Sequence, residues 1–193
     1  MPNVYPITVP IHVDDALLLA LSASNNHLKM ERDKEGNLIV MSPSGSRVSE
    51  FQGELFFQLV LWNKKYKYGF CFESQAGFRL PDGSVMSPDV SWMSKQKWES
   101  LTEEQQNGFA PACPEFIIEV ISPGDTLAQQ QGKMNRWLEN GCELAWLIQL
   151  AEKKVWVYRK DSKEIELNEG FSQKLSGENV LDGFKLDLSE LEY

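Results

Sequence analysis

Cysteine and histidine are scarce in this sequence, and their scarcity excludes two common kinds of small-protein framework. The three cysteines, Cys71, Cys113 and Cys142, are far apart and form no Cys-x-x-Cys pair, which indicates reduced thiols and neither a zinc site nor a disulfide framework. His12 and His27 are the two histidines, so little room remains for a histidine-based metal centre.

The sequence also lacks long apolar runs and a basic leader. No window approaches eighteen apolar residues, so no membrane span is predicted. The first two dozen residues carry no basic n-region, and Asp14 and Asp15 interrupt their apolar part. These features argue against a secretory signal and predict a cytoplasmic protein.

Basic residues are fewer than acidic ones, 19 against 28. The formal net charge is −9 and the isoelectric point is near 4.8. Non-specific DNA binding depends on Lys and Arg neutralising phosphates, so this balance argues against a protein that coats free duplex. An enzyme that gathers a few acids around metal ions, and meets phosphate only there, remains possible. The sequence contains no basic arm, helix-turn-helix or zinc finger that would read a recognition site.

The 193 residues and 42% hydrophobic content suit one α/β domain spanning residues 1–193. Spacing of apolar residues predicts helices over Val13–Ser24, Ser46–Tyr66, Ser94–Asn107 and Asp125–Asn140, the last capped by Asp125 or Thr126. Alternation and turn residues predict a hairpin over His27–Met41 and strands over Gly69–Leu80, Val85–Met93, Glu115–Ile121, Glu143–Leu150 and Lys154–Arg159. We therefore expect a mixed, partly antiparallel sheet with helices packed against it.

A carboxylate stands in the middle of the most apolar predicted strand. Because side chains alternate along a strand, Glu119 shares one face with Ile117 and Ile121. An unpaired ionised carboxylate there would be strongly unfavourable, so Glu119 needs a cation or must stay protonated. The cation is a Lys, an Arg or a bound metal, and a purely structural ion pair is one interpretation.

Asp89 and Lys133 supply the context that favours chemistry. Asp89 follows a proline near a strand start, where an Asp is often a turn cap, but the chain between it and Glu119 is long enough to bring both together on neighbouring strands. Two such oxygen ligands suit Mg²⁺. Lys133 lies at the shoulder of the apolar stripe of its predicted helix, where it either snorkels to solvent or stabilises charge on a phosphate.

These residues together resemble the Uma2 family of restriction-endonuclease-like proteins, whose wider relatives are the PD-(D/E)xK nucleases. The resemblance covers about Met41 to Arg159. It depends on GFRLPDGSVMSPDVSWM (Gly77–Met93), on PEFIIEVISPGDTLAQQQGKMNRWLENG (Pro114–Gly141), and on the WLI before Gln149. The ordered set Pro-Asp-Val, Glu-Val-x-Ser-Pro, Lys-Met and Asn-Gly is specific, although each piece alone is weak.

The resemblance implies a restriction-endonuclease-like core, a mixed β-sheet flanked by helices. It implies Mg²⁺ (or Mn²⁺) held by Asp89 and Glu119, with the carbonyl of Val120 as a further ligand. The chain departs from the superfamily pattern because Ile121 occupies the place of the (D/E)xK lysine. Lys133 on the following helix is expected to supply that lysine.

Nucleases of this type often add a further polar residue to the site. The resemblance makes Glu50 and Glu54 on the helix from Ser46 candidates, and spacing does not choose between them. Gln75 is a third candidate, expected to face inward from the strand Gly69–Leu80. Gln149-Leu150 also replaces the Asp-Pro that relatives often carry, which affects only the turn geometry.

The sequence thus predicts a metal-dependent DNA endonuclease that hydrolyses phosphodiester bonds and assembles as a homodimer, with Met1–Ser24 contributing to the interface. Its acidic chain predicts weak or site-limited binding of DNA. Two alternatives stay open: a catalytically silent interaction module that keeps the nuclease fold, and a metal-dependent hydrolase of a small phosphorylated substrate.

Overall fold

The predicted central strand lies inside a mixed sheet in the computed structural model, which describes residues 6–189. Within that range the main sheet has the strand order β11-β10-β9-β8-β7-β4. Its strands are β4 (Gly69–Glu73), β7 (Val90–Ser94), β8 (Phe116–Val120), β9 (Leu144–Gln149), β10 (Lys154–Arg159) and β11 (Glu166–Glu169). Strand β8 runs parallel to β9 and antiparallel to β7, so the predicted interior position of this segment and the mixed sheet are both confirmed.

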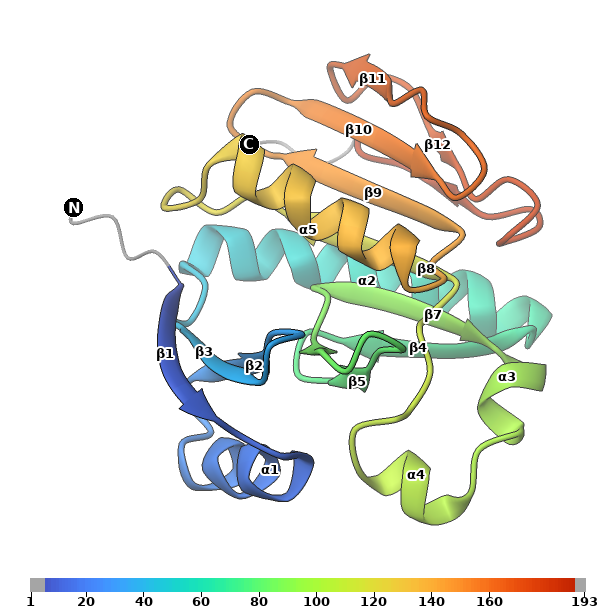
Figure 1. Ribbon diagram of the computed structural model, residues 1–193. Coiled ribbons are helices and arrows are strands. Elements are labelled where there is room, and N and C mark those ends of the chain that lie inside the picture. Colours follow the sequence, from blue (N-terminus) through green and yellow to red (C-terminus); the bar gives the residue numbers. More distant parts are fainter. Residues whose placement is uncertain (1–5, 190–193) are drawn as a thin grey trace.

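Helices cover both faces of this sheet because β8 is apolar on both (Figure 1). Alternation sends Phe116, Ile118 and Val120 into the core under helix α2 (Ser46–Tyr66). Helix α2 buries residues at three- and four-residue steps on that side: Val48, Phe51, Leu55, Leu59 and Trp62. The opposite face, with Ile117 and Ile121, packs under helix α5 (Leu127–Glu139) through Met134 and Trp137. Glu119 therefore projects toward α5.

A second sheet adjoins the first and is built mostly from the N-terminal part of the chain (Figure 1). Among the described residues its order is β1-β3-β2-β6-β5. Its strands are β1 (Ile7–His12), β2 (Lys29–Arg32), β3 (Asn37–Met41), β5 (Phe78–Arg79) and β6 (Val85–Met86), and helix α1 (Asp15–Ser24) packs beside it. Strands β2 and β3 form the predicted hairpin, whose turn places Gly36 at φ 90°, a conformation that favours glycine. Strand β1 was not predicted.

Two predicted strands were wrong in extent. The segment Gly69–Leu80 forms β4 and β5, and the segment Val85–Met93 forms β6 and β7; in each case the two strands belong to different sheets. The second break falls at Ser87-Pro88-Asp89, because proline has no backbone N–H to donate to a ladder. The connector Ser87–Asp89 therefore carries the chain from the second sheet into the main sheet.

The remaining elements are short. The helix predicted over Ser94–Asn107 is interrupted, because Ser100 ends one helix and Thr102 caps the next. These short elements are α3 (Lys95–Glu99), α4 (Glu103–Asn107), β12 (Leu175–Ser176) and β13 (Lys185–Leu186). Across residues 6–189, none of the helices is both long and apolar enough to cross a bilayer.

Helix α5 begins with a capping box that yields a stability prediction. Thr126 Oγ1 accepts from the Gln129 N–H, and the Gln129 side chain accepts from the Thr126 N–H. We expect Thr126→Ala to lower the free energy of unfolding by about 1 kcal/mol in urea titrations. Thr102→Ala removes the same motif from α4, which buries no residue, and should cost less. Equal losses would contradict a role of α5 in anchoring the core.

Candidate active site

Asp89 and Glu119 come from adjacent strands of the main sheet. The β7–β8 ladder pairs Val90 with Ile118, so extending that antiparallel register by one residue sets Asp89 opposite Glu119, on the α5 face. Asp89 Oδ2 accepts a hydrogen bond from the Val120 N–H at 2.8 Å, which holds this carboxylate at the end of β8. The two acids thus meet where the connector enters the sheet.

Helix α5 places a cation and a hydrogen-bond donor on Glu119. Lys133 Nζ lies 2.8 Å from Glu119 Oε1, and Trp137 Nε1–H donates to the same oxygen at 2.9 Å. Lys133 and Trp137 are four residues apart, so they project from one side of the helix. Glu119 is only 3% exposed, and this pair of donors accounts for how a carboxylate is kept inside the sheet.

Strand β2 contributes two charged residues that the sequence did not single out. Glu31 Oε1 lies 3.4 Å from Lys133 Nζ and accepts from the Ser87 N–H at 3.0 Å. Lys29 Nζ lies 3.5 Å from Asp89 Oδ1. Alternation along β2 puts Lys29 and Glu31 on one face, which is the signal that could have found them. That signal was ambiguous, because an exposed strand face carries the same kind of pattern.

The five charged side chains, Lys29, Glu31, Asp89, Glu119 and Lys133, form one cluster with a formal charge of −1. Burial raises the pKa of Glu119, the Asp89 charge raises it further, and Lys133 opposes both. Burial by itself lowers the pKa of Lys133, but Glu119, Glu31 and Asp89 outweigh it and raise that pKa overall. We assign Glu119 and Lys133 as carboxylate and ammonium, because both hydrogen-bond donors on Glu119 favour its charged form.

A match to a known protein family covers the part of the chain that contains this cluster. The family model Uma2, described as "Putative restriction endonuclease", matches residues 14–189, a range that includes the whole cluster. The chain belongs to the Uma2 family. The resemblance stated from the motifs is therefore confirmed. No curated protein matches the chain.

A solved structure shares the Uma2 chain's fold. It is a crystal structure described as a "putative nuclease belonging to DUF820" from Anabaena variabilis, with a TM-score of 0.70 and 20% sequence identity. The match covers 84% of this chain and 88% of that one. At that identity the likeness shows the fold alone, and it confirms the prediction of a nuclease-type core with a mixed sheet flanked by helices.

The three additional site candidates have different surroundings. Gln75 was wrongly placed on an inward-facing strand position, because β4 ends at Glu73 and Gln75 is exposed in the following turn. The Glu54 carboxylate accepts a hydrogen bond from the Gln58 side chain. Gln58 also bonds the backbone of Asp187, so Glu54 faces the C-terminal segment. Glu50 is exposed on α2, and its part in the site stays a prediction. The buried acid beside Lys133 is Glu31.

The cluster's donor chemistry suits a divalent cation, but its arrangement is that of an ion-paired state. Carboxylates of Asp89, Glu119 and Glu31 are the hard oxygen ligands that Mg²⁺ prefers. Within residues 6–189, no three or more His, Cys, Asp or Glu side chains are placed to hold a metal as they stand. Asp89, Glu119 and Glu31 would hold such a cation with the Lys133 ammonium, already on Glu119 Oε1, beside it.

The charge of the cluster predicts which single substitution costs most. Lys133→Met leaves a formal charge of −2 around buried acids, and breaking a buried pair in this way should cost about 3–5 kcal/mol of unfolding free energy. Glu119→Gln leaves a formal charge of zero, and Lys133 keeps Glu31 at 3.4 Å, so it should cost much less. Urea titrations of both variants and wild type measure the order.

The Lys133→Met deficit should also depend on pH. Without Lys133, the pKa of Glu119 in the folded state rises further above its unfolded value. Such a carboxyl binds a proton more tightly in the folded state, so the deficit should shrink at acidic pH and grow as pH rises through that raised pKa. An equal deficit at pH values either side of neutrality, or a greater loss for Glu119→Gln, would contradict this account of the cluster.

Proposed function

We propose that this Uma2 protein is a metal-dependent DNA endonuclease that hydrolyses phosphodiester bonds at Asp89, Glu119 and Lys133. The observation that carries the proposal is a buried carboxylate, Glu119, meeting a second carboxylate and a lysine at the end of a sheet strand. An arrangement that costs desolvation and leaves net negative charge is poorly suited to stability alone. The family's description, "Putative restriction endonuclease", supports the same chemistry.

Asp89, Glu119 and the Val120 carbonyl would hold Mg²⁺ or Mn²⁺. When bound, the ion lowers the pKa of a coordinated water and so supplies the attacking hydroxide. The Lys133 ammonium would stabilise negative charge on the phosphate. Glu31, already 3.4 Å from Lys133 Nζ, keeps that ammonium near the site. Trp137 keeps Glu119 oriented through its N–H bond to Oε1.

The acidic composition supports one rival, an interaction module in which the cluster serves only the fold. The same composition allows a metal-dependent hydrolase of a small phosphorylated molecule, which needs no basic surface. Retention of both carboxylates and the lysine weighs against the module, because a decayed site usually loses a member. Assays on DNA and on small phosphate esters distinguish the DNA endonuclease from the hydrolase of a small phosphorylated molecule.

Nicking of supercoiled plasmid in millimolar Mn²⁺ tests the proposal. Because metal binds only the folded site, it should raise the melting temperature of wild type. Asp89→Asn and Glu119→Gln each remove a proposed ligand, so both should lose this rise and lose cleavage. Lys133→Ala should keep the thermal shift in the fraction that folds, yet lose about a hundredfold or more in rate, because its role is in the transition state.

An exposed ion pair provides the matched control. Lys154 lies 2.8 Å from Glu152 at the turn between β9 and β10, outside the cluster. Lys154→Ala and Glu152→Gln make the same chemical changes and should leave nicking at the wild-type rate. Cleavage that persists in Glu119→Gln, or is absent in wild type with no metal-dependent shift, would overturn the proposal.

We further propose that the protein is a homodimer, since cutting both strands of a symmetric site takes two active sites. Met1–Tyr5 of the predicted contributor Met1–Ser24 lie outside the described residues. Within its described part, β1 is an edge strand of the second sheet, and its residues Ile7 (61%) and Ile11 (54%) are exposed. An open strand edge with exposed apolar side chains suits pairing with another chain.

Light scattering at micromolar concentration measures the assembly. Wild type should have the mass of a dimer, and Ile7→Glu with Ile11→Glu should give a monomer, because two carboxylates would be buried on pairing. Ile165→Glu with Leu167→Glu make the same change at β11, an edge strand of the main sheet, and should leave the dimer intact. A monomeric wild type refutes the dimer.

A further inference from the structure

One stretch of this acidic chain carries no acid at all. Residues 55–72 contain no Asp or Glu, although the chain has 28 of them. The same stretch contains Lys64, Lys65 and Lys67, interleaved with Tyr66 and Tyr68. The C-terminal end of α2 therefore gathers three lysines and two tyrosines, with no acid of its own, on a protein of net charge −9.

The two tyrosines are held together by a reversal of the chain. Helix α2 ends at Tyr66, and Lys67 adopts a left-handed conformation with φ 57° while its N–H donates to the Asn63 carbonyl. The reversal stacks Tyr68 on Tyr66, with ring centroids 5.5 Å apart and planes 26° from parallel. Both residues are exposed, at 37% for Tyr66 and 46% for Tyr68, and Lys65 Nζ lies over the Tyr66 ring, 5.0 Å from its centroid.

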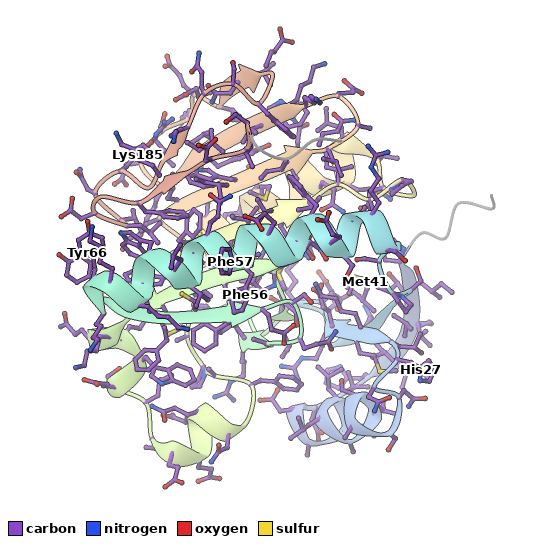
Figure 2. The ribbon with its side chains drawn as sticks, turned by 180° about the vertical axis from the view of Figure 1, so that it is seen from behind. His27, Met41, Phe56, Phe57, Tyr66 and Lys185 are labelled. Carbon is purple, nitrogen blue, oxygen red and sulfur yellow. The ribbon has the colours of Figure 1, made fainter. Side chains whose placement is uncertain are left out.

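Lysines from elsewhere in the chain flank this end of the helix. On one side a groove of about 320 Å³ runs between Leu61, Lys65 and Tyr66 of α2 and Lys185 of β13. Figure 2 shows Tyr66 at the tip of α2 with Lys185 beside it. On the other side a groove of about 500 Å³ is lined by residues of α2, β4 and α3: Val60, Asn63, Lys64, Lys67, Gly69, Phe70, Cys71, Lys95 and Glu99. The Glu99 carboxylate in that groove pairs with Lys95 at 3.6 Å.

This surface is separate from the candidate active site. Asp89 precedes β7, whereas Ser94 at the other end of β7 pairs with Gly69, which directly follows Tyr68. Five strand residues span roughly 17 Å. In addition, α2 lies on the face of the sheet opposite to α5, so its lysines do not approach the Glu119 cluster (Figure 1).

We propose that the C-terminal end of α2 is a binding surface for single-stranded nucleic acid. Lys64, Lys65 and Lys67 contact the phosphates, and bases stack on the exposed tyrosine pair, the combination by which proteins hold single strands without sequence preference. The inference rests on the proposed nuclease function, because it supplies the local positive charge that an acidic nuclease needs to engage its substrate. A polyanion without bases would use the lysines alone.

Fluorescence anisotropy with a labelled single-stranded oligonucleotide tests this surface, using Glu119→Gln protein in EDTA so that no cleavage occurs. Neutralising the three lysines to Gln should weaken binding at least tenfold. It should also reduce the slope of log affinity against log salt by about 2, since each phosphate contact on a single strand contributes about 0.7. Lys153→Gln, Lys160→Gln and Lys163→Gln form the matched control and should change neither value; these lysines are exposed just beyond the ends of β10, which β9, β8 and β7 separate from β4.

The tyrosines are tested with apolar variants, because both rings pack near Trp62. Tyr66→Leu with Tyr68→Leu should weaken oligonucleotide binding about tenfold, whereas Tyr66→Phe with Tyr68→Phe, which keep the ring faces, should retain it. Thermal melts confirm that each variant is folded. Binding to heparin should be unchanged by the Leu variants.

The outcomes separate this inference from the proposed function. Oligonucleotide binding that survives lysine neutralisation overturns the surface, whatever the plasmid assay shows. A surface that serves any polyanion or an anionic membrane is revealed if the Leu variants bind normally, or if vesicles containing phosphatidylserine compete as well as DNA does, and either result overturns the proposal. Binding that depends on both lysines and tyrosines supports it even if nicking fails.

Discussion

The buried contact between Lys133 and Glu119 is the interaction on which the candidate site depends. A carboxylate in the middle of β8 can be tolerated only because α5 brings an ammonium and an indole N–H to the same oxygen. That requirement fixes how α5 is rotated against the sheet, because Lys133 and Trp137 must both face β8. The apolar contacts of Met134 and Trp137 then complete the packing of the helix.

The connector Ser87–Asp89 gives this contact its surroundings. Pro88 ends the pairing of one sheet, and the next residue, Asp89, begins the approach to the other. Each side of the connector is tied to the cluster: Ser87 donates to Glu31, and Asp89 accepts from Val120. The charged cluster thus lies where the two sheets meet, and neither sheet alone contains it.

The sequence predicted most of the main sheet and the residues on it, because period and composition are local signals. The apolar run around Glu119 and the three- and four-residue spacing in α2 report burial directly. Glu31 and Lys29 could not be chosen in the same way. Their burial arises from the packing of β2 against a connector more than fifty residues later, and a charged alternating strand is equally typical of a solvated edge. The strand position predicted for Gln75 was wrong for a related reason, since a turn divides a segment that reads as one continuous strand.

The order of the cluster along the chain has a consequence for folding. Glu31 is synthesised about a hundred residues before Lys133, the cation that it contacts in the native state. During synthesis the N-terminal hairpin therefore emerges before the lysine that its acid contacts in the native state. Contacts of such long sequence separation close late, because the loop between them costs entropy before the contact repays it. The charged cluster is therefore complete only when strand β2 and helix α5 are both packed in their native positions.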